Sequence, residues 1–156
     1  MNVRARVGAS LVIGILAAVA AAGSAQTKVG SGDIVADRQR LMKLNGASWA
    51  DVQAKAKAGQ IEAIAVNAET MALNSMHIPS MFPEGSLTEK SKAKPEVWQK
   101  WAEFEKAAQN MQTEAEKLRD AAKAKNADLT QAIVKDFGRN ACGSCHTPFR
   151  VPPPRS

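Results

Sequence analysis

The sequence contains no run in which β-branched residues alternate with polar ones, and this absence argues against a β-sheet. It holds only two cysteines, too few for a zinc site built mainly from thiolates. A basic stripe interleaved with aromatic residues, typical of nucleic-acid-binding proteins, is also missing. Lysines instead alternate with glutamates along predicted helical faces. The chain is therefore expected to be helical, with its chemistry concentrated in a few residues.

The two cysteines lie in the sequence Cys142-Gly143-Ser144-Cys145-His146, which is the attachment signature of a c-type haem. Each thiol adds across one vinyl group of the haem, and two vinyl groups require two cysteines about one helical turn apart. The histidine that follows supplies the proximal ligand of the iron. The sixth coordination position then decides between electron transfer and ligand binding. The motif predicts one haem c bound through two thioethers.

Two other interpretations of the motif fit the chain less well. A Cys-x-x-Cys pair can form a redox disulfide, but the βαβ setting of a thioredoxin-like motif is missing. A zinc site would need His77 or a carboxylate as its fourth ligand. Covalent haem is therefore the interpretation that we carry forward.

Residues 1–25 have the pattern of a signal peptide. Two arginines precede an apolar run at 7–22, and small residues follow at 23–25. The run is shorter than the ~20 residues that span a bilayer comfortably, which disfavours a permanent membrane anchor. We expect export to the periplasm of a Gram-negative bacterium, cleavage, and a mature chain of residues 26–156 that forms a single domain.

The charge of the mature chain is mildly basic. Without the two signal-peptide arginines, 19 Lys and Arg stand against 15 Asp and Glu, a side-chain balance of +4. We expect this charge to be spread over a solvated surface, so that any attraction toward an acidic partner weakens with added salt.

Helical periodicity predicts four helices in the mature chain. The first begins at Asp33, whose side chain can accept hydrogen bonds from first-turn amides, and ends at Gly59. The second covers 60–75, and Pro79 and Pro83 prevent its continuation. The predicted inward positions of these two helices are Ile34, Leu41, Met42, Asn45, Trp49, Val52, Ile61, Ile64, Ala65, Ala68, Met71 and Ala72.

Residues 76–94 form one long predicted connection, rich in loop-forming residues. The third helix is expected over 95–126, and the fourth from a cap at Asp128 to the prolines at 152–154. Their predicted inward positions are Val97, Trp101, Phe104, Ala108, Met111, Ala115, Leu118, Ala122, Leu129, Ile133 and Phe137. The expected fold is an all-α four-helix bundle with one long connection between helices 2 and 3 and haem attached near the C-terminus of helix 4.

A four-helix chain with Cys-x-x-Cys-His near its C-terminus resembles the class II c-type cytochromes, the cytochrome c′ family. The resemblance covers residues 32–151. It is carried by Asp33-Ile34-Val35 with Arg38-Gln39-Arg40-Leu41-Met42-Lys43, by Pro95-Glu96-Val97-Trp98, and by Ala141-Cys142-Gly143-Ser144-Cys145-His146 with Phe149-Arg150. In that family the first helix faces the distal side of the haem.

The resemblance implies two kinds of distal site. High-spin members place a non-coordinating side chain there and leave the iron five-coordinate, whereas low-spin members of the cytochrome c-556 type supply a methionine. The stretch Leu41-Met42-Lys43 resembles the low-spin pattern, which implies that Met42 is the sixth ligand. Spacing alone does not choose among Met42, Met71, Met76, Met81 and Met111, and Met42 could simply fill the core.

Three further residues are candidates near the iron. His77 could give a bis-histidine haem of lower potential, but it follows a helix end, where surface and capping roles are common, and the family has no ligand there. Arg150 lies one turn after His146, where it could pair with a haem propionate or support the proximal pocket. Arg38 lies one turn before Met42 and could act similarly on the distal side. Solvated arginines are the alternative for both.

These features together predict a periplasmic electron-transfer protein, not an enzyme, with His146 and Met42 as axial ligands. Its expected partners are redox proteins and, during maturation, the haem-ligation machinery, with no nucleic acid and no stable membrane insertion after cleavage. The alternative is a five-coordinate haem protein that binds NO or CO, and a thiol oxidoreductase is a third possibility. The resemblance implies that a dimer would pair through the first helices, as in high-spin members. Lys43 and Lys55, expected on exposed turns, leave no clear apolar patch for that contact, which favours a monomer, with a dimer as the alternative.

Overall fold

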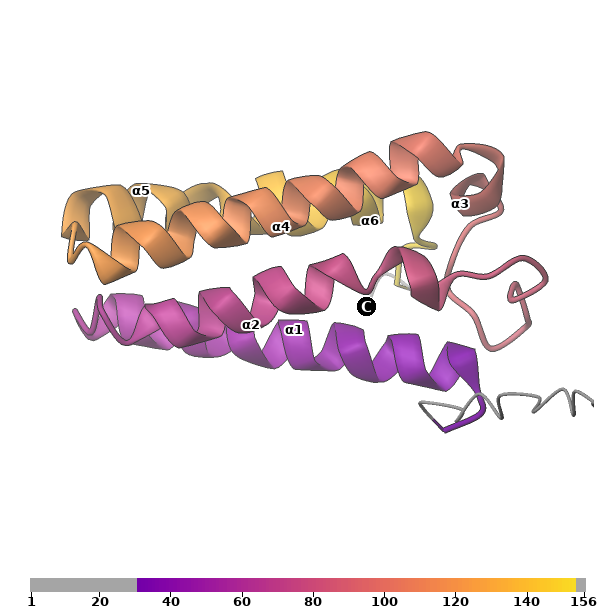
Figure 1. The fold of residues 1–156 in the computed structure, drawn as a ribbon, viewed down its shortest axis with the longest axis horizontal. Coiled ribbons are helices and arrows are strands. Elements are labelled where there is room, and N and C mark those ends of the chain that lie inside the picture. Colours follow the sequence, from indigo (N-terminus) through magenta and orange to yellow (C-terminus); the bar gives the residue numbers. More distant parts are fainter. Residues whose placement is uncertain (1–30, 154–156) are drawn as a thin grey trace, which may run out of the picture.

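The computed structural model describes residues 31–153, so the predicted signal peptide lies outside the described residues. Figure 1 shows a helical bundle in which α1 (Ile34–Lys57) and α2 (Ile64–Met76) lie along one side. Helix α4 (Trp101–Lys123) and the C-terminal helices lie along the other. Within residues 31–153 the only β pairing is an isolated bridge between Ala93 and Arg150. The predicted all-α four-helix bundle is confirmed.

Helix α1 begins and ends where the sequence predicts. The carboxylate of Asp33 accepts hydrogen bonds from the backbone amides of Val35 and Ala36, at 3.0 and 3.1 Å. These bonds satisfy two amides that have no partner within the helix. Gly59 follows the helix with φ at +72°, a conformation that a residue without Cβ adopts freely.

Helix α2 begins at Ile64, four residues later than the sequence predicts. The amide of Ile64 donates to the carbonyl of Ile61, and that of Ala65 to the carbonyl of Glu62, both at 3.1 Å. These three-residue spacings belong to tight turns rather than to an α-helix. The intervening turn reverses the chain so that α2 packs antiparallel to α1.

The predicted third helix is divided at Lys100, whose φ of −125° and ψ of 49° are not helical. The short helix α3 (Glu96–Gln99) precedes the break, and α4 follows it. The indole N–H of Trp98 donates to the carbonyls of Phe82 and Pro83, at 3.0 and 3.1 Å. These bonds hold α3 against the long connection, which itself contains a short 3₁₀ helix at Pro79–Met81.

The predicted fourth helix consists of three segments: α5 (Ala127–Phe137), the π-helix η2 (Gly138–Gly143) and α6 (Ser144–Phe149). Its cap is Asn126, whose side-chain oxygen accepts from the amide of Leu129 at 3.0 Å, so the prediction of Asp128 as the cap is wrong. The inward placement of Leu129 is also wrong, because 49% of this residue is exposed. With the cap two residues earlier, Thr130 is the fully buried residue of the first turn.

The last helix ends at Phe149, before the prolines that were expected to stop it. Beyond it the chain is extended and pairs with the long connection. The amide of Lys94 donates to the carbonyl of Phe149 at 2.9 Å, and the amide of Val151 donates to the carbonyl of Lys92 at 2.8 Å. This pairing places the C-terminal motif beside the connection, at the end of the bundle where α1 begins (Figure 1).

Two clusters of buried side chains form the core. The first occupies the part of the bundle around α2, α4 and α5, and consists of Val52, Ala56, Ile64, Ala68, Met71, Ala72, Met111, Ala115, Leu118, Ala122, Phe137 and Ala141. The second lies beside the long connection and consists of Ile78, Phe82, Val97, Phe104, Ala108 and Phe149. The predicted seam of α4 is confirmed, since its residues from Phe104 to Ala122 contribute to both clusters.

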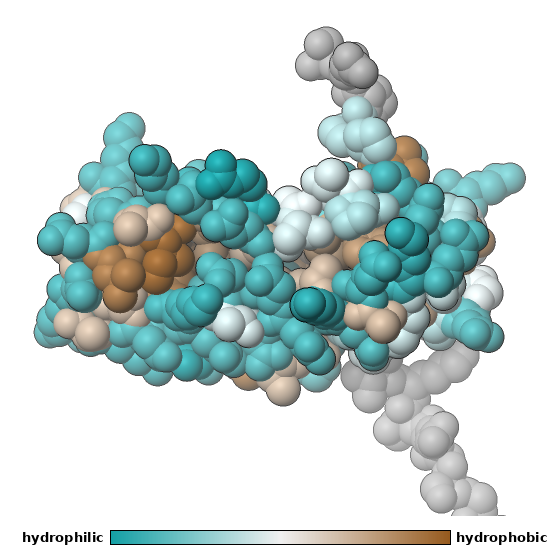
Figure 2. All heavy atoms as spheres, turned by 90° about the horizontal axis from the view of Figure 1, so that it is seen from above, coloured by the Kyte–Doolittle hydropathy of each residue, from teal (hydrophilic) through white to brown (hydrophobic). Residues whose placement is uncertain are grey.

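The surface differs from the prediction at Lys55. Its ammonium group pairs with Asp51 at 2.7 Å and donates to the side-chain oxygen of Asn67 at 2.6 Å, so the residue is half-buried between α1 and α2. Large apolar residues are exposed on these two helices, including Leu44 at 58% and Leu73 at 52%. The face seen in Figure 2 is mostly hydrophilic. No helix within residues 31–153 is long and apolar enough to cross a membrane.

Two leucines that the sequence places inside the bundle provide a matched stability test. Leu118 is completely buried, so Leu118→Ala should lower the free energy of unfolding by about 2 to 5 kcal/mol. Leu129→Ala removes the same atoms from an exposed position and should cost less than about 1 kcal/mol. Urea denaturation followed by circular dichroism measures both. Equal losses would contradict the burial described here.

Candidate haem site

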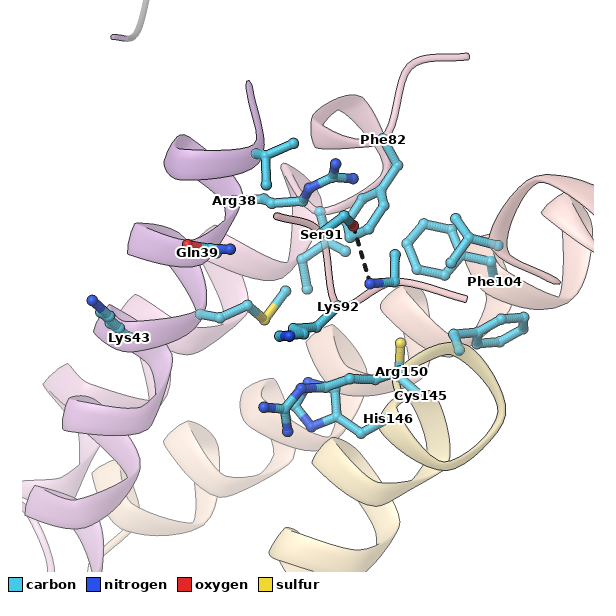
Figure 3. Close-up of a pocket in the computed structure, with 16 residues that line it drawn as sticks. Arg38, Gln39, Lys43, Phe82, Ser91, Lys92, Phe104, Cys145, His146 and Arg150 are labelled. Carbon is cyan, nitrogen blue, oxygen red and sulfur yellow. Dashed lines mark hydrogen bonds between the residues drawn. The ribbon is translucent and has the colours of Figure 1, made fainter. Parts of the chain in front are cut away.

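A cavity of about 420 Å³ lies at the end of the bundle beside the long connection. This volume is within the range of cofactor and ligand pockets. Its walls come from α1, the connection, α3, α4 and the C-terminal segment, and Figure 3 shows residues of these segments converging on it. The lining consists of Val35, Arg38, Gln39, Met42, Lys43, Ile78, Phe82, Ser91, Lys92, Ala93, Val97, Phe104, Cys145, His146, Phe149 and Arg150.

The Cys-x-x-Cys-His motif contributes directly to this cavity. Cys145 and His146 line it from α6, and Cys142 is half-buried one turn earlier, against the first core cluster. Cys142 lies in the π-helix η2, which begins and ends with glycines, Gly138 and Gly143. A Cβ on Gly143 would lie 3.4 Å from the carbonyl oxygen of Gly138, a tight contact. Short π-helices are frequently found at functional sites.

Burial keeps both thiols protonated. Desolvation raises the pKa of Cys142, and it raises the pKa of Cys145 to about 11, with the neighbouring Cys142 adding to the effect. Catalytic thiols show the opposite change, because the thiolate is the reactive form. The environment favours neutral sulfur, which a thioether also provides. No group of three or more His, Cys, Asp or Glu side chains within residues 31–153 could hold a metal ion, which also argues against the zinc interpretation.

The imidazole of His146 is kept neutral. Burial lowers its pKa, and the positive charge of Arg150 lowers it further. A neutral imidazole retains a nitrogen lone pair, which is the form that binds metals. The backbone amide of Arg150 donates to the carbonyl of His146 at 3.0 Å, so the two residues are fixed in one turn. Figure 3 shows their side chains next to each other in the cavity wall.

Met42 is the only one of the five methionines within the described chain that lines the cavity. Met71 and Met111 are buried in the first core cluster, and Met76 is 58% exposed. Met81 packs against the second core cluster but does not line the cavity. Of the five candidates, the structure therefore places only Met42 at the cavity.

His77 lies away from the cavity. It is exposed at the C-terminal end of α2, and its carbonyl accepts a hydrogen bond from the hydroxyl of Ser80 at 2.9 Å. It is not among the residues that line the cavity. The surface role considered for this histidine fits its position.

Arg38 is buried in the cavity wall, with only 4% of its surface exposed. Its guanidinium donates to the carbonyl and the hydroxyl of Ser86 and lies 4.5 Å from the centre of the Phe82 ring. Burial lowers its pKa, an effect that the Asp33 carboxylate opposes. The Nε atom is buried and has no hydrogen-bond partner. A solvated position for Arg38 is excluded, whereas Arg150 is an exposed residue at the cavity.

A chain of aromatic contacts joins the walls of the cavity. The ring of Phe104 on α4 lies 4.8 Å from that of Phe82 in the connection and 5.4 Å from that of Phe149 on α6, both edge to face. Arg38 on α1 extends the chain through its contact with Phe82. Edge-to-face pairs add stability beyond that of the buried area.

The sequence did not identify the connection as part of the site. Phe82, Ser91 and Lys92 line the cavity, yet nothing in their local pattern indicates this role. The only indication in the sequence was the length of the connection, because a connection of this length must cross one end of the bundle and can cover a site there. The cavity wall therefore contains residues of two kinds. Those of the Cys-x-x-Cys-His motif are neighbours in the sequence, and the others come together only when the chain folds.

The residues present fit a covalently attached haem. The two cysteines and the histidine lie in the adjoining segments η2 and α6, an apolar and aromatic cavity adjoins them, and a methionine lines the same cavity from α1. The buried, unpartnered Nε of Arg38 adds a donor suited to a carboxylate.

Comparisons with known proteins agree with this fit. The family model for Cytochrome C' matches residues 33–150. Cytochrome c-556 from Agrobacterium tumefaciens is 30% identical over 120 residues, which make up 75% of this chain and 96% of that protein. Cytochrome c-554 from Cereibacter sphaeroides is 39% identical over 82 residues, or 51% of this chain and 52% of the relative.

Solved structures give the same assignment. Cytochrome c′ from Rubrivivax gelatinosus superposes with a TM-score of 0.66 at 28% identity, covering 76% of this chain and 95% of that one. The nitric oxide complex of a cytochrome c prime variant from Alcaligenes xylosoxidans gives 0.68 at 28% identity, with 78% and 96% covered. The chain therefore belongs to the cytochrome c′ family, the class II c-type cytochromes, which bind haem c covalently.

Proposed function

We propose that this chain is an electron carrier in which His146 and Met42 are the axial ligands of haem iron and Cys142 and Cys145 form the thioethers. One observation carries the proposal. The cavity receives a single methionine from α1 and the motif histidine from α6, and these residue types form a common axial pair in electron-transfer cytochromes.

Haem c, when bound, supplies an iron that gains and loses one electron. The neutral imidazole of His146 offers its lone pair without first losing a proton. The thioether of Met42 favours reduced iron and raises the reduction potential relative to a second imidazole. With both axial positions filled by side chains, no position is left for a substrate, which is why we propose a carrier rather than an enzyme.

The cavity walls support this role in two further ways. The rings of Phe82, Phe104 and Phe149 exclude water from one side and are fixed by contacts with each other. The unpaired Nε of Arg38 is suited to donate to a haem propionate, with its other nitrogens held by Ser86. Arg150 is proposed to support the proximal side through its contact with His146.

Gas binding is the second candidate function. A variant of cytochrome c prime from Alcaligenes xylosoxidans that superposes on this chain at 28% identity is a nitric oxide complex. The spin state of the resting iron distinguishes the two functions, because gas binding at an open site requires five-coordinate, high-spin iron.

Location and assembly are also proposals. We propose a periplasmic location from the signal-peptide pattern of residues 1–25. The expected monomer stays a prediction with a weaker basis, because Lys55 is half-buried and Leu44 and Leu73 are exposed on α1 and α2. Sedimentation equilibrium of the holoprotein measures the oligomeric state.

The ligand role of Met42 can be tested against a matched control. Met42→Ala should leave a folded holoprotein whose iron shifts toward high spin and binds carbon monoxide readily when reduced. Met81→Ala removes a second half-buried methionine of the same cluster, and its iron should stay low-spin. Each truncation should cost at most about 2 to 5 kcal/mol, so circular dichroism must first establish that both variants are folded.

Two results would decide against Met42. Wild-type iron that is already high-spin, and takes up carbon monoxide without a displacement lag, would make gas binding the better proposal. A low-spin Met42→Ala variant would mean that another side chain holds the iron. His77→Ala in that background would then identify whether the second imidazole is responsible.

Covalent attachment is tested by extraction with acid and organic solvent. Wild-type protein expressed with haem-ligation machinery should retain its haem, and Cys142→Ala combined with Cys145→Ala should release it. Ser144→Ala is the control, because it changes an exposed residue between the two cysteines. Complete release of haem from wild-type protein would refute the thioethers.

A further inference from the structure

The cavity is lined by four basic residues and by no aspartate or glutamate. Arg38 is buried, whereas Lys43, Lys92 and Arg150 are exposed. Lys43 comes from α1, Lys92 from the long connection and Arg150 from the segment after α6, and Figure 3 shows all three around the cavity. We call these three residues the cationic collar.

The collar is a local group of positive charges without acidic residues in the same cavity lining. Residues 31–153 contain 17 Lys and Arg against 15 Asp and Glu, and with the four cavity residues set aside the balance becomes 13 against 15. The rest of the described surface is therefore slightly acidic. The even spread of charge over the whole mature chain stays a prediction, and the structure adds a local group of cations at the cavity, whose lining contains no aspartate or glutamate.

No carboxylate in the described chain neutralises the collar. Seven of the 13 basic residues of the described chain outside the cavity lining form ion pairs, such as Lys117 with Glu114 at 2.7 Å and Arg139 with Asp136 at 2.8 Å. Neither Lys43, Lys92 nor Arg150 pairs with an acidic residue of the described chain. The two propionates of a bound haem offer two negative charges against four basic residues, so a positive excess remains at the cavity mouth.

We propose that the collar is the docking surface for an acidic redox protein whose own carboxylates surround its redox centre. The inference rests on the proposed electron-carrier function and names its partner class. Charge complementarity at the cavity mouth would bring the two redox centres together, and fixed charges around a low-dielectric cavity focus the field that steers the encounter. A lipid surface offers matching charge but no electron, so the position of the collar at the haem site favours a protein.

The test uses holoprotein and reduced flavodoxin, an acidic redox protein, as the probe. The collar variant is Lys43→Gln with Lys92→Gln. Its control is Lys57→Gln with Lys123→Gln, two exposed residues at the opposite end of the bundle that form no ion pair within the described chain (Figure 1). Both variants lose two positive charges, so they share one net charge and differ only in where it is lost.

At low ionic strength the collar variant should be reduced by flavodoxin about tenfold more slowly than wild type, and the control less than about twofold more slowly. The difference should vanish near 0.5 M salt, where the screening length is only a few ångströms. Neutral reduced lumiflavin should reduce all three proteins equally. Equal slowing of both variants, or a wild-type rate independent of salt, would overturn the proposal.

A binding measurement separates this inference from the proposed function. Calorimetric titration with oxidised flavodoxin requires no electron transfer, and it should show weaker binding for the collar variant alone even if the iron proves to be five-coordinate. Collar-dependent sedimentation with phosphatidylglycerol vesicles, together with unchanged flavodoxin binding, would replace the protein partner by a membrane and refute the inference.

Discussion

The contacts of Phe104 hold the site together. Its ring packs against Phe82 of the connection and Phe149 of α6, and Phe82 lies beneath the guanidinium of Arg38 on α1. Four segments distant in sequence thus share one buried contact chain. Phe149 follows His146 by three residues, so this packing also sets where the proximal imidazole stands. The second core cluster therefore also forms the wall of the haem cavity, because Phe82, Phe104 and Phe149 belong to both.

The fold could be predicted wherever a local interaction decides it. Asp33 caps α1 because its carboxylate reaches two first-turn amides, and Gly59 ends the helix because it adopts positive φ. Asn126 and Asp128 are both good caps, and the sequence offered no means of choosing between them. The inward placement of Leu129 failed for a separate reason: each step of four residues turns by about 40° on an α-helix, so two such steps back from Phe137 carry Leu129 off the buried face that Thr130 shares. The break at Lys100 depends on how α3 meets the connection, which is a tertiary contact.

In the candidate site, too, the residues defined by a local pattern could be predicted and those defined by tertiary contacts could not. Cys142, Cys145 and His146 are recognisable because attachment chemistry fixes their spacing. From the sequence, Met42 could be singled out only through resemblance to a family, because residue spacing does not separate the five methionines, and only the folded chain shows which of them lines the cavity. Ser86 and Phe82, which hold Arg38, lie in the long connection, and a loop's partners depend on where the bundle places its ends. The grouping of Lys43, Lys92 and Arg150 was hidden as well, because composition counts charges and does not record which of them the fold brings to one cavity.

The π-helix at Gly138–Gly143 gives the last segment an independent register. Such a segment corresponds to one residue inserted into an α-helix, and one residue turns everything after it by roughly 100°. Upstream, Phe137 keeps its place against Trp49, with the ring centres 4.9 Å apart, while Cys145 and His146 face another part of the molecule. The same length of helical chain can therefore place Phe137 in the packed core and, one turn of π-helix later, place Cys145 and His146 in the wall of the cavity.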